Sequence, residues 1–304
     1  MSDSSLTRRR FLSATGVGVA CAALTQRSVR AQPRRPETNR KAVKLGMVQI
    51  EGNLRDKFAL LKKLGFDGVE LGSPNGFDTT EVLAARDETE LPIHGVVDSV
   101  HWGKPLSHPD PRIRAEGLEG LRRAMRDAKA YGATTVLLVP AVVNKEVGYR
   151  EAYERSQAEI RKVLPLASEL GVRIALENVW NQFLLSPLET ARYIDELDPE
   201  IVGAYFDVGN VVNYGWPEQW IEVLGERILK VDVKEFSRKK RNDEGLWKGF
   251  GVELHEGDCD WPAVMQALDA VGYRGWFTAE IPGGGEERLA RIAQDMDKIL
   301  AYAK

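Results

Sequence analysis

Two short stretches in the middle of the chain decide the fold: residues 173–177 read RIALE, and residues 202–207 read VGAYFD. Each is an almost continuous apolar run that ends on a carboxylate, Glu177 in the first and Asp207 in the second. Runs of this kind are typical of parallel strands buried on both faces, whereas half-exposed strands alternate apolar and polar residues. Residues 187–197, which lie between the two runs, carry a helical pattern. The three segments therefore predict a strand–helix–strand unit with parallel strands.

The same alternation of strand-like runs and helical patterns covers residues 42–304. Six further apolar runs predict strands at 43–50, 68–71, 93–97, 134–139, 229–233 and 276–281. Further helical patterns lie at 112–131, 151–170, 262–271 and 286–301. Eight strands that alternate with helices predict one α/β domain over 42–304, a closed (β/α)8 TIM barrel. The longest predicted loop, 236–260, follows the seventh strand.

The first residues carry a different pattern, which resembles a twin-arginine export signal. Residues 7–12 read TRRRFL, a weakly apolar stretch follows over 13–25, and small residues at 28–31 suit a signal peptidase. We therefore expect a signal peptide at 1–31, a linker at 32–41, and a periplasmic or otherwise exported protein carried by the twin-arginine machinery. The apolar stretch is shorter than the roughly 20 residues that span a bilayer, so we expect no stable membrane anchor. The alternative is a basic N-terminus without any signal.

Composition excludes several classes of protein. The 304 residues are 43% hydrophobic and 29% charged, which is typical of a globular protein and not of a disordered one. The net charge of −3 argues against a general nucleic-acid binder, whose charge is normally positive, so we expect no nucleic-acid partner. Two cysteines, Cys21 and Cys259, cannot form a disulfide framework, and four histidines exclude a site built from a large histidine cluster.

Acidic side chains stand at or near the ends of several predicted strands. Besides Glu177 and Asp207, these are Glu70, Asp232 and Glu280. The active site of a TIM barrel lies at the C-terminal ends of its strands, so we expect these carboxylates to converge there. Buried carboxylates are costly unless they are paired or bound to a metal, and a cluster of like charges needs a cation. Oxygen ligands favour Mn²⁺ or Mg²⁺ over Zn²⁺. The alternative to a metal site is that some of these acidic residues only cap helices.

Five segments carry a resemblance to a known family; they are residues 174–180, 206–210, 231–234, 256–261 and 272–280. Residues 256–261 read EGDCDW and residues 272–280 read GYRGWFTAE. Over 43–304, the chain resembles the xylose isomerase-like TIM-barrel superfamily. Within it, the chain is most similar to sugar and sugar-phosphate isomerases and epimerases of the ketose 3-epimerase and hydroxypyruvate isomerase type.

The resemblance implies a site with one divalent metal ion, Mn²⁺ first, with Mg²⁺ or Co²⁺ as alternatives. It makes Glu177, Asp207 and Glu280 ligands of that ion. Asp232 stands at the position of the family's fourth ligand, a histidine, and is the expected fourth ligand here. The resemblance also makes Glu177 and Glu280 the pair of residues that move the proton.

Further side chains near the predicted strand ends are candidates for binding the substrate. By resemblance, Arg238 matches an arginine that contacts the substrate, and Asn210 stands where ketose epimerases often have a substrate-binding histidine. Lys234 either stabilises a developing oxyanion or pairs with a carboxylate. The remaining candidates either contact the sugar or support the local structure; they are Glu70, His101, Trp102, Asn178 and Trp180.

Together these features predict a metal-dependent sugar isomerase or epimerase. It would interconvert ketoses or keto-sugars, or their phosphates, through an enediolate by glutamate-mediated proton transfer. Export, and the lack of a glycine-rich phosphate loop in the sequence, favour a substrate without phosphate. Two alternatives stay open: a keto-inositol (inosose) dehydratase-type lyase, and a non-catalytic periplasmic sugar-binding barrel. The expected partner is a small-molecule sugar, and the resemblance leaves a homo-oligomer open as well, since relatives often form dimers or tetramers.

Overall fold

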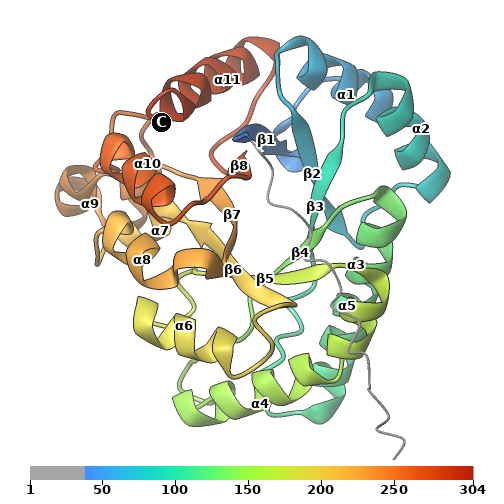
Figure 1. Cartoon of the computed structure of the whole chain (residues 1–304), viewed down its shortest axis with the longest axis vertical. Coiled ribbons are helices and arrows are strands. Elements are labelled where there is room, and N and C mark those ends of the chain that lie inside the picture. Colours follow the sequence, from blue (N-terminus) through green and yellow to red (C-terminus); the bar gives the residue numbers. More distant parts are fainter. Residues whose placement is uncertain (1–37, 304) are drawn as a thin grey trace, which may run out of the picture. The chain divides into compact units, whose positions relative to one another are not determined.

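Eight parallel strands close into a barrel in the computed structural model, which describes residues 38–303 (Figure 1). The strands are β1 (Arg40–Lys44), β2 (Gly68–Ser73), β3 (Ile93–Asp98), β4 (Thr135–Leu138), β5 (Arg173–Glu177), β6 (Val202–Asp207), β7 (Ile228–Val233) and β8 (Trp276–Ala279). Each strand pairs with the next along the chain, and β8 pairs with β1, where Trp276 lies opposite Arg40. The predicted TIM barrel is confirmed.

Helices follow the strands and surround the barrel, as Figure 1 shows. They are α1 (Leu54–Lys63), α2 (Thr79–Thr89), α3 (Pro111–Tyr131), α4 (Tyr149–Arg161), α5 (Leu164–Leu170), α6 (Pro187–Asp195), α7 (Val208–Val212), α8 (Pro217–Leu224), α9 (Arg238–Glu244), α10 (Trp261–Ala270) and α11 (Glu286–Leu300), with short 3₁₀ turns η1 (Leu45–Met47), η2 (Gly225–Arg227) and η3 (Leu246–Phe250). The helix predicted over 151–170 is two helices, α4 and α5. Pro165 in the first turn of α5 has no N–H with which to continue the hydrogen bonds of α4.

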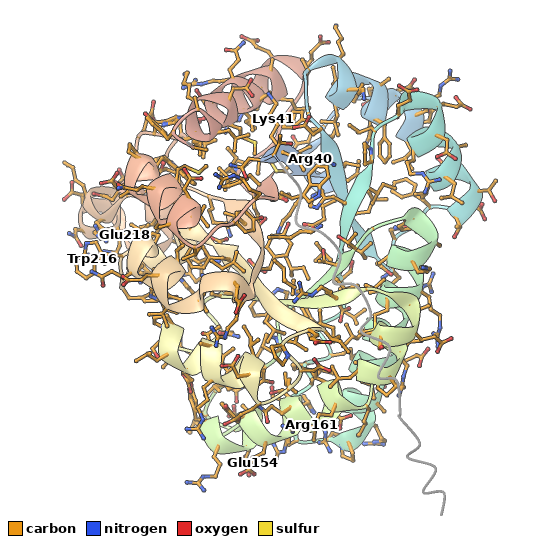
Figure 2. All side chains as sticks on the ribbon, in the orientation of Figure 1. Arg40, Lys41, Glu154, Arg161, Trp216 and Glu218 are labelled. Atoms are coloured by element: carbon orange, nitrogen blue, oxygen red, sulfur yellow. The ribbon has the colours of Figure 1, made fainter. Side chains whose placement is uncertain are left out.

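The first strand differs most from the prediction. The sequence predicts a strand at 43–50 and a linker at 32–41, whereas β1 begins at Arg40, inside that linker. Figure 2 labels its first two residues, Arg40 and Lys41. Lys41 is buried, and its Nζ lies 2.5 Å from Oδ1 of Asp297. β1 thus begins with two basic residues, so a search for apolar runs cannot predict where this strand starts.

The export signal predicted over 1–31, and the part of the linker before residue 38, lie outside the described residues. Among the helices between residues 38 and 303, none is long and apolar enough to cross a membrane. The longest of them, α3, has 21 residues, and charged side chains interrupt it throughout.

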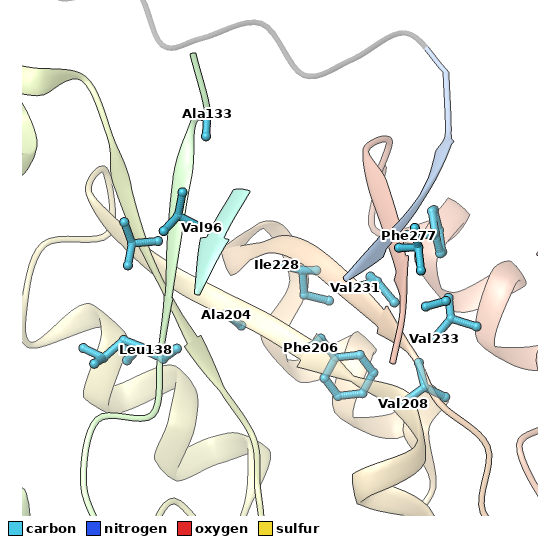
Figure 3. Packing of buried hydrophobic residues seen from close by; sticks show 14 of the residues in the cluster. Val96, Ala133, Leu138, Ala204, Phe206, Val208, Ile228, Val231, Val233 and Phe277 are labelled. Carbon is cyan, nitrogen blue, oxygen red and sulfur yellow. The ribbon is translucent and has the colours of Figure 1, made fainter. Parts of the chain in front are cut away.

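Alternate residues of each strand face opposite sides of the barrel wall. Outward-facing residues such as Phe206, Val231 and Phe277 belong to one large apolar core that includes the helices (Figure 3). Inward-facing residues of three neighbouring strands form a separate small apolar cluster, made of Leu137, Ala175 and Tyr205. Side chains two positions further along these strands therefore also point into the barrel.

The barrel interior holds a buried polar network as well. Nζ of Lys230 lies 2.7 Å from Nδ1 of His94, and Oγ1 of Thr278 lies 3.2 Å from Nε2 of His94. Burial lowers the pKa of Lys230 to about 7. Burial, and then the charge of Lys230, lowers the pKa of His94. His94 is thus a core histidine whose two ring nitrogens both have hydrogen-bond partners. Because side chains alternate along a strand, Asp232, two residues after Lys230 in β7, also points into the barrel.

Candidate metal and active site

The C-terminal ends of four consecutive strands bring four carboxylates together. Glu177 ends β5, Asp207 ends β6, Asp232 is next to last in β7, and Glu280 directly follows β8. One oxygen of each lies within 4.8 Å of the corresponding oxygens of the other three. They meet because all four share the inward-facing parity of their strands. The structure thus gathers the four residues predicted as metal ligands.

Asp207 uses its two carboxylate oxygens differently. Oδ1 accepts a hydrogen bond of 2.8 Å from the backbone N–H of Asn210 and so caps α7. Oδ2 lies 2.7 Å from Nζ of Lys234, inside the acidic cluster. Asp207 therefore both caps a helix and belongs to the acidic cluster. The amide of Asn178 donates to the backbone carbonyl of Asp207 and accepts from its N–H, both at 2.8 Å, so Asn178 orders the end of β6.

Two lysines lie among the carboxylates, and one of them, Lys234, is a residue predicted from the sequence. Lys234, which follows β7, places Nζ 2.7 Å from Asp207 and 3.4 Å from Glu280. Lys44, the last residue of β1, places Nζ 3.0 Å from Oδ2 of Asp232 and 2.8 Å from Oε2 of Glu280. Lys44 was missed because the predicted strand extended well beyond it. The feature of the sequence that could have indicated Lys44 is its position as a lone lysine within an apolar run.

These lysines separate the two glutamates in acidity. Burial raises the pKa of Glu177 to about 8, and the charge of Glu280 acts in the same direction. Burial also raises the pKa of Glu280, but Lys44 and Lys234 outweigh it and bring that pKa to about 2. In the chain without a cation, Glu177 is therefore mostly protonated at neutral pH and Glu280 is ionised. Two carboxyl groups held in opposite protonation states are suited to give and to take a proton.

The acidic cluster fits a divalent cation by charge and by ligand chemistry. When ionised, the four carboxylates carry four negative charges, of which Lys44 and Lys234 neutralise two. A divalent cation would balance the other two. Oδ1 of Asp232 is buried without a hydrogen-bond partner, which is costly unless a ligand completes it. Carboxylate oxygens are hard donors that suit Mg²⁺ and Mn²⁺, so these four residues could hold such an ion.

A cavity of about 330 Å³ lies against the carboxylates. Its walls are formed by Trp102, Glu177, Val179, Trp180, Asn210, Lys234, Trp247, Phe250, Glu280, Ile281 and Pro282. Four of the predicted substrate contacts are among them: Trp102, Trp180, Asn210 and Lys234. Trp247 and Phe250, which belong to η3 in the long loop after β7, are not among the residues predicted from the sequence. The feature of the sequence that could have indicated them is a pair of aromatic residues in an otherwise polar loop.

Arg238, which the resemblance assigns to the substrate, does not line this cavity. Its Nε and one terminal nitrogen donate to the backbone carbonyls of Val212 and Gly215, at 2.9 and 2.8 Å. Its guanidinium also lies over the ring of Trp216, 5.3 Å from the centroid. The side chain therefore holds the segment between α7 and α8 in place.

Glu70 and His101 are buried beside the cavity rather than in its wall. Glu70 lies deeper in the barrel, 4.0 Å from Nζ of Lys44, because β2 continues for three residues beyond it. Nδ1 of His101 accepts a hydrogen bond from the backbone N–H of Val139 at 3.2 Å. Burial lowers the pKa of His101 to about 4, so the ring is neutral. Its one proton then sits on Nε2.

Comparison with known proteins identifies the family. Residues 58–302 match the family model described as a xylose isomerase-like TIM barrel, so the chain belongs to this family, as its sequence predicts. The chain is also similar to L-ribulose-5-phosphate 3-epimerase UlaE of Escherichia coli (strain SMS-3-5 / SECEC). The two are 25% identical over 259 residues, which cover 81% of this chain and 88% of that relative.

Solved structures of epimerases share the fold. The 3-keto-D-glucoside 4-epimerase YcjR of E. coli superposes with a TM-score of 0.71 at 17% identity, covering 87% of this chain and 100% of that chain. The D-allulose 3-epimerase of Methylomonas sp. has the same TM-score at 18% identity, covering 87% of this chain and 99% of that chain. At these identities the likeness shows the fold alone.

Proposed function

We propose that this protein is a metal-dependent sugar epimerase or isomerase that moves a proton at a carbon next to a carbonyl group. One observation carries the proposal: Glu177 and Glu280 line the same cavity, at the end where four carboxylates converge in a cluster that suits a divalent cation. The similarity to an L-ribulose-5-phosphate 3-epimerase supports the same class of reaction. Of the candidate ions, Mn²⁺ is the first to test.

The mechanism assigns one step to each glutamate. A divalent cation in the cluster would polarise the carbonyl group of the bound sugar and so acidify the neighbouring C–H bond. Glu280, kept ionised by Lys44 and Lys234, accepts the proton from that carbon, which leaves an enediolate. Glu177 returns a proton to the same carbon from the opposite face, which inverts its configuration. If Glu177 instead protonates the former carbonyl carbon, a proton shift between the two oxygens completes an isomerisation.

The order of the two pKa values, and not their absolute size, sets this assignment. A bound cation favours the ionised form of every carboxylate around it. Lys44 and Lys234 contact Glu280 and leave Glu177 without an ion pair among the described residues, so Glu177 remains the weaker acid. After one turnover the two glutamates have exchanged protonation states, and exchange with solvent protons restores them.

Side chains around the glutamates position the sugar. Burial lowers the pKa of Lys234, but the charges of Asp207 and Glu280 outweigh it, so the ammonium stays charged and can donate to a substrate oxygen. Nε1 of Trp180 donates to the backbone carbonyl of Asn210 at 2.8 Å, which fixes the indole ring as a wall of the cavity. Together, Lys234 and the fixed ring of Trp180 would orient a bound sugar toward the glutamates.

Deuterium uptake from D₂O, followed by NMR on a panel of ketoses and keto-sugars, tests the proposal directly. We expect uptake at one carbon with Mn²⁺ and none with EDTA, and the labelled carbon distinguishes an epimerase from an isomerase. Glu177→Gln and Glu280→Gln should each reduce the rate by roughly 10²–10⁴-fold. Arg238→Gln, outside the cavity, serves as the control. Uptake that persists in EDTA, or in both glutamate variants, contradicts the mechanism.

The same experiment separates the two alternatives. A lyase of the keto-inositol dehydratase type removes the same kind of proton but then expels water, so its product lacks a hydroxyl group. A non-catalytic sugar-binding barrel binds metal and sugar without any uptake of deuterium. Product analysis and uptake together therefore assign the chain to one of the three.

We also propose that the protein is exported through the twin-arginine pathway to the periplasm. Arg8-Arg9-Arg10-Phe11-Leu12, followed by a weakly apolar stretch, supports this location. Fusing residues 1–31 to a reporter that is active only after export tests it. Changing Arg8 and Arg9 to lysine should abolish export, while export that survives this change assigns the segment to another route.

A further inference from the structure

Aromatic side chains form much of the cavity wall away from the carboxylates. The ring of Trp180 lies 4.9 Å from the ring of Trp247 and 4.9 Å from that of Phe250, measured between centroids. Trp102 joins the same wall from the loop after β3, whereas Trp247 comes from the loop after β7. In a closed barrel of eight strands, β3 and β7 are four positions apart and so stand on opposite sides. Trp102 and Trp247 therefore flank the cavity.

These two indole rings are open to solvent. Trp102 is 53% exposed and Trp247 is 69% exposed, although both line the cavity. The ionisable residues of the wall are less exposed: Glu177 is buried, and the side chains of Lys234 and Glu280 are 16% and 33% exposed. The cavity thus has a charged end and an exposed aromatic end. Large apolar side chains exposed at the mouth of a polar site mark a surface that a ligand covers.

The cavity is poorly equipped for a phosphate group. Among the described residues that line it, Lys234 is the one cation, and it is already paired with Asp207 and Glu280. Arg238, the arginine that the resemblance assigns to the substrate, donates to two backbone carbonyls instead. Recognition of a phosphate depends on cations or helix N-termini with free donors. The N-terminus of α7, at the rim of the cluster, is capped by Asp207 itself.

We propose that the site takes a neutral keto-sugar carrying a second sugar ring, in preference to a free or phosphorylated ketose. The carbonyl end of this ligand would lie at the carboxylates, and the second ring would lie between Trp102 and Trp247. Sugar rings present C–H groups on their flat faces, and indole rings offer large rigid apolar faces to pack against them. This inference rests on the proposed function, since it places the reacting carbonyl at the acidic cluster.

Isothermal titration calorimetry with the full chain and Mn²⁺ tests the preference on matched probes. The probes are D-fructose, fructose 6-phosphate and three glucosyl-fructoses: isomaltulose, maltulose and turanose. Fructose 6-phosphate and isomaltulose carry a phosphate and a glucosyl ring on the same oxygen, while the other two attach the ring elsewhere. We expect one glucosyl-fructose to bind roughly ten-fold more tightly than fructose, and fructose 6-phosphate to gain nothing over fructose.

Variants of the two tryptophans locate the second ring. Trp102→Ala and Trp247→Ala should remove most of the ten-fold gain, so that each weakens binding of the glucosyl-fructose more than binding of fructose, while Trp247→Phe should keep part of the gain. Trp216→Ala is the control, because Trp216 is 55% exposed but is not part of the cavity wall. An equal loss for fructose and for the glucosyl-fructose shows a merely structural role and overturns the proposal.

The remaining outcomes are equally decisive. Tightest binding of fructose 6-phosphate overturns the proposal, and so does a failure of all five sugars to bind. Binding does not depend on turnover, so these results are independent of the deuterium test. Deuterium uptake that is fastest with a phosphorylated ketose leaves the epimerase or isomerase standing and refutes the second-ring site. Selective binding without any uptake refutes the proposed reaction.

Discussion

Replacing Lys44 with methionine removes the ammonium group between Asp232 and Glu280 and keeps most of the length of the side chain. Nζ lies 2.8 Å from Oε2 of Glu280 and 3.0 Å from Oδ2 of Asp232. At an effective dielectric constant of about 20, each contact corresponds to about 6 kcal/mol of Coulomb attraction. Most of that attraction offsets the cost of burying the charges. Breaking a buried pair therefore destabilises a protein by about 3–5 kcal/mol.

The variant should unfold at a lower temperature when no metal is present. At roughly 2 °C per kcal/mol for a domain of this size, the loss corresponds to about 6–10 °C in Tm. Adding Mn²⁺ should restore much of this difference, because the cation supplies the missing positive charge and is no longer repelled by Lys44. Thermal unfolding in EDTA and in Mn²⁺, followed by circular dichroism, measures both effects.

Lys41→Met is the matched control for this experiment. Lys41 is a buried lysine on the same strand, and its Nζ pairs with Asp297, outside the acidic cluster. Its replacement should lower Tm by the same amount in EDTA and in Mn²⁺. Two results would refute the reasoning: an unchanged Tm of Lys44→Met in EDTA, or a Mn²⁺ effect of equal size in both variants and the unaltered protein.

Three further predictions follow from the site. The pKa of Glu177 is raised from 4.5 to about 8, so the folded chain binds an extra proton between these values. The stability that protonated Glu177 contributes in EDTA is therefore lost as the pH rises from about 4.5 to about 8. In Glu177→Gln, the free energy of urea unfolding should depend less on pH over this range. An unchanged dependence on pH contradicts the raised pKa. Asn178→Ala leaves the backbone N–H and carbonyl of Asp207 without their partner and should cost about 1–3 kcal/mol in urea unfolding, together with weaker Mn²⁺ binding in calorimetry. Arg238→Ala frees two backbone carbonyls and should lower Tm while KM for the sugar stays within about two-fold of the unaltered protein, whereas a large rise in KM restores its predicted contact with the substrate.

Some of the molecule could be predicted because the constraint is local. A strand buried on both faces must be apolar along its whole length, so the runs at 173–177 and 202–207 already indicate parallel strands. A carboxylate at the end of such a run is costly unless something compensates it, which singles out Glu177 and Asp207. Glu280 is found in the same way, and the structure gathers all of them with Asp232 at one rim.

Other parts depended on contacts between distant segments. Lys44 belongs to the site because β1 closes the barrel against β8, and nothing in its own neighbourhood shows that pairing. Trp247 reaches the cavity because the loop after β7 folds back over Trp180, and loop spacing does not determine where a loop lies. Arg238 turns away because two backbone carbonyls accept its protons.

The sequence by itself determined the barrel, its family and which carboxylates end its strands, because burial on both faces and side-chain alternation act over a few neighbouring residues. Only the tertiary structure decided how these carboxylates are balanced. Lys44 and Lys234 approach them from two different strand ends and lower the pKa of Glu280, while burial raises the pKa of Glu177. Electrostatic energies depend on distances across the barrel, and those distances exist only once all eight strands have closed.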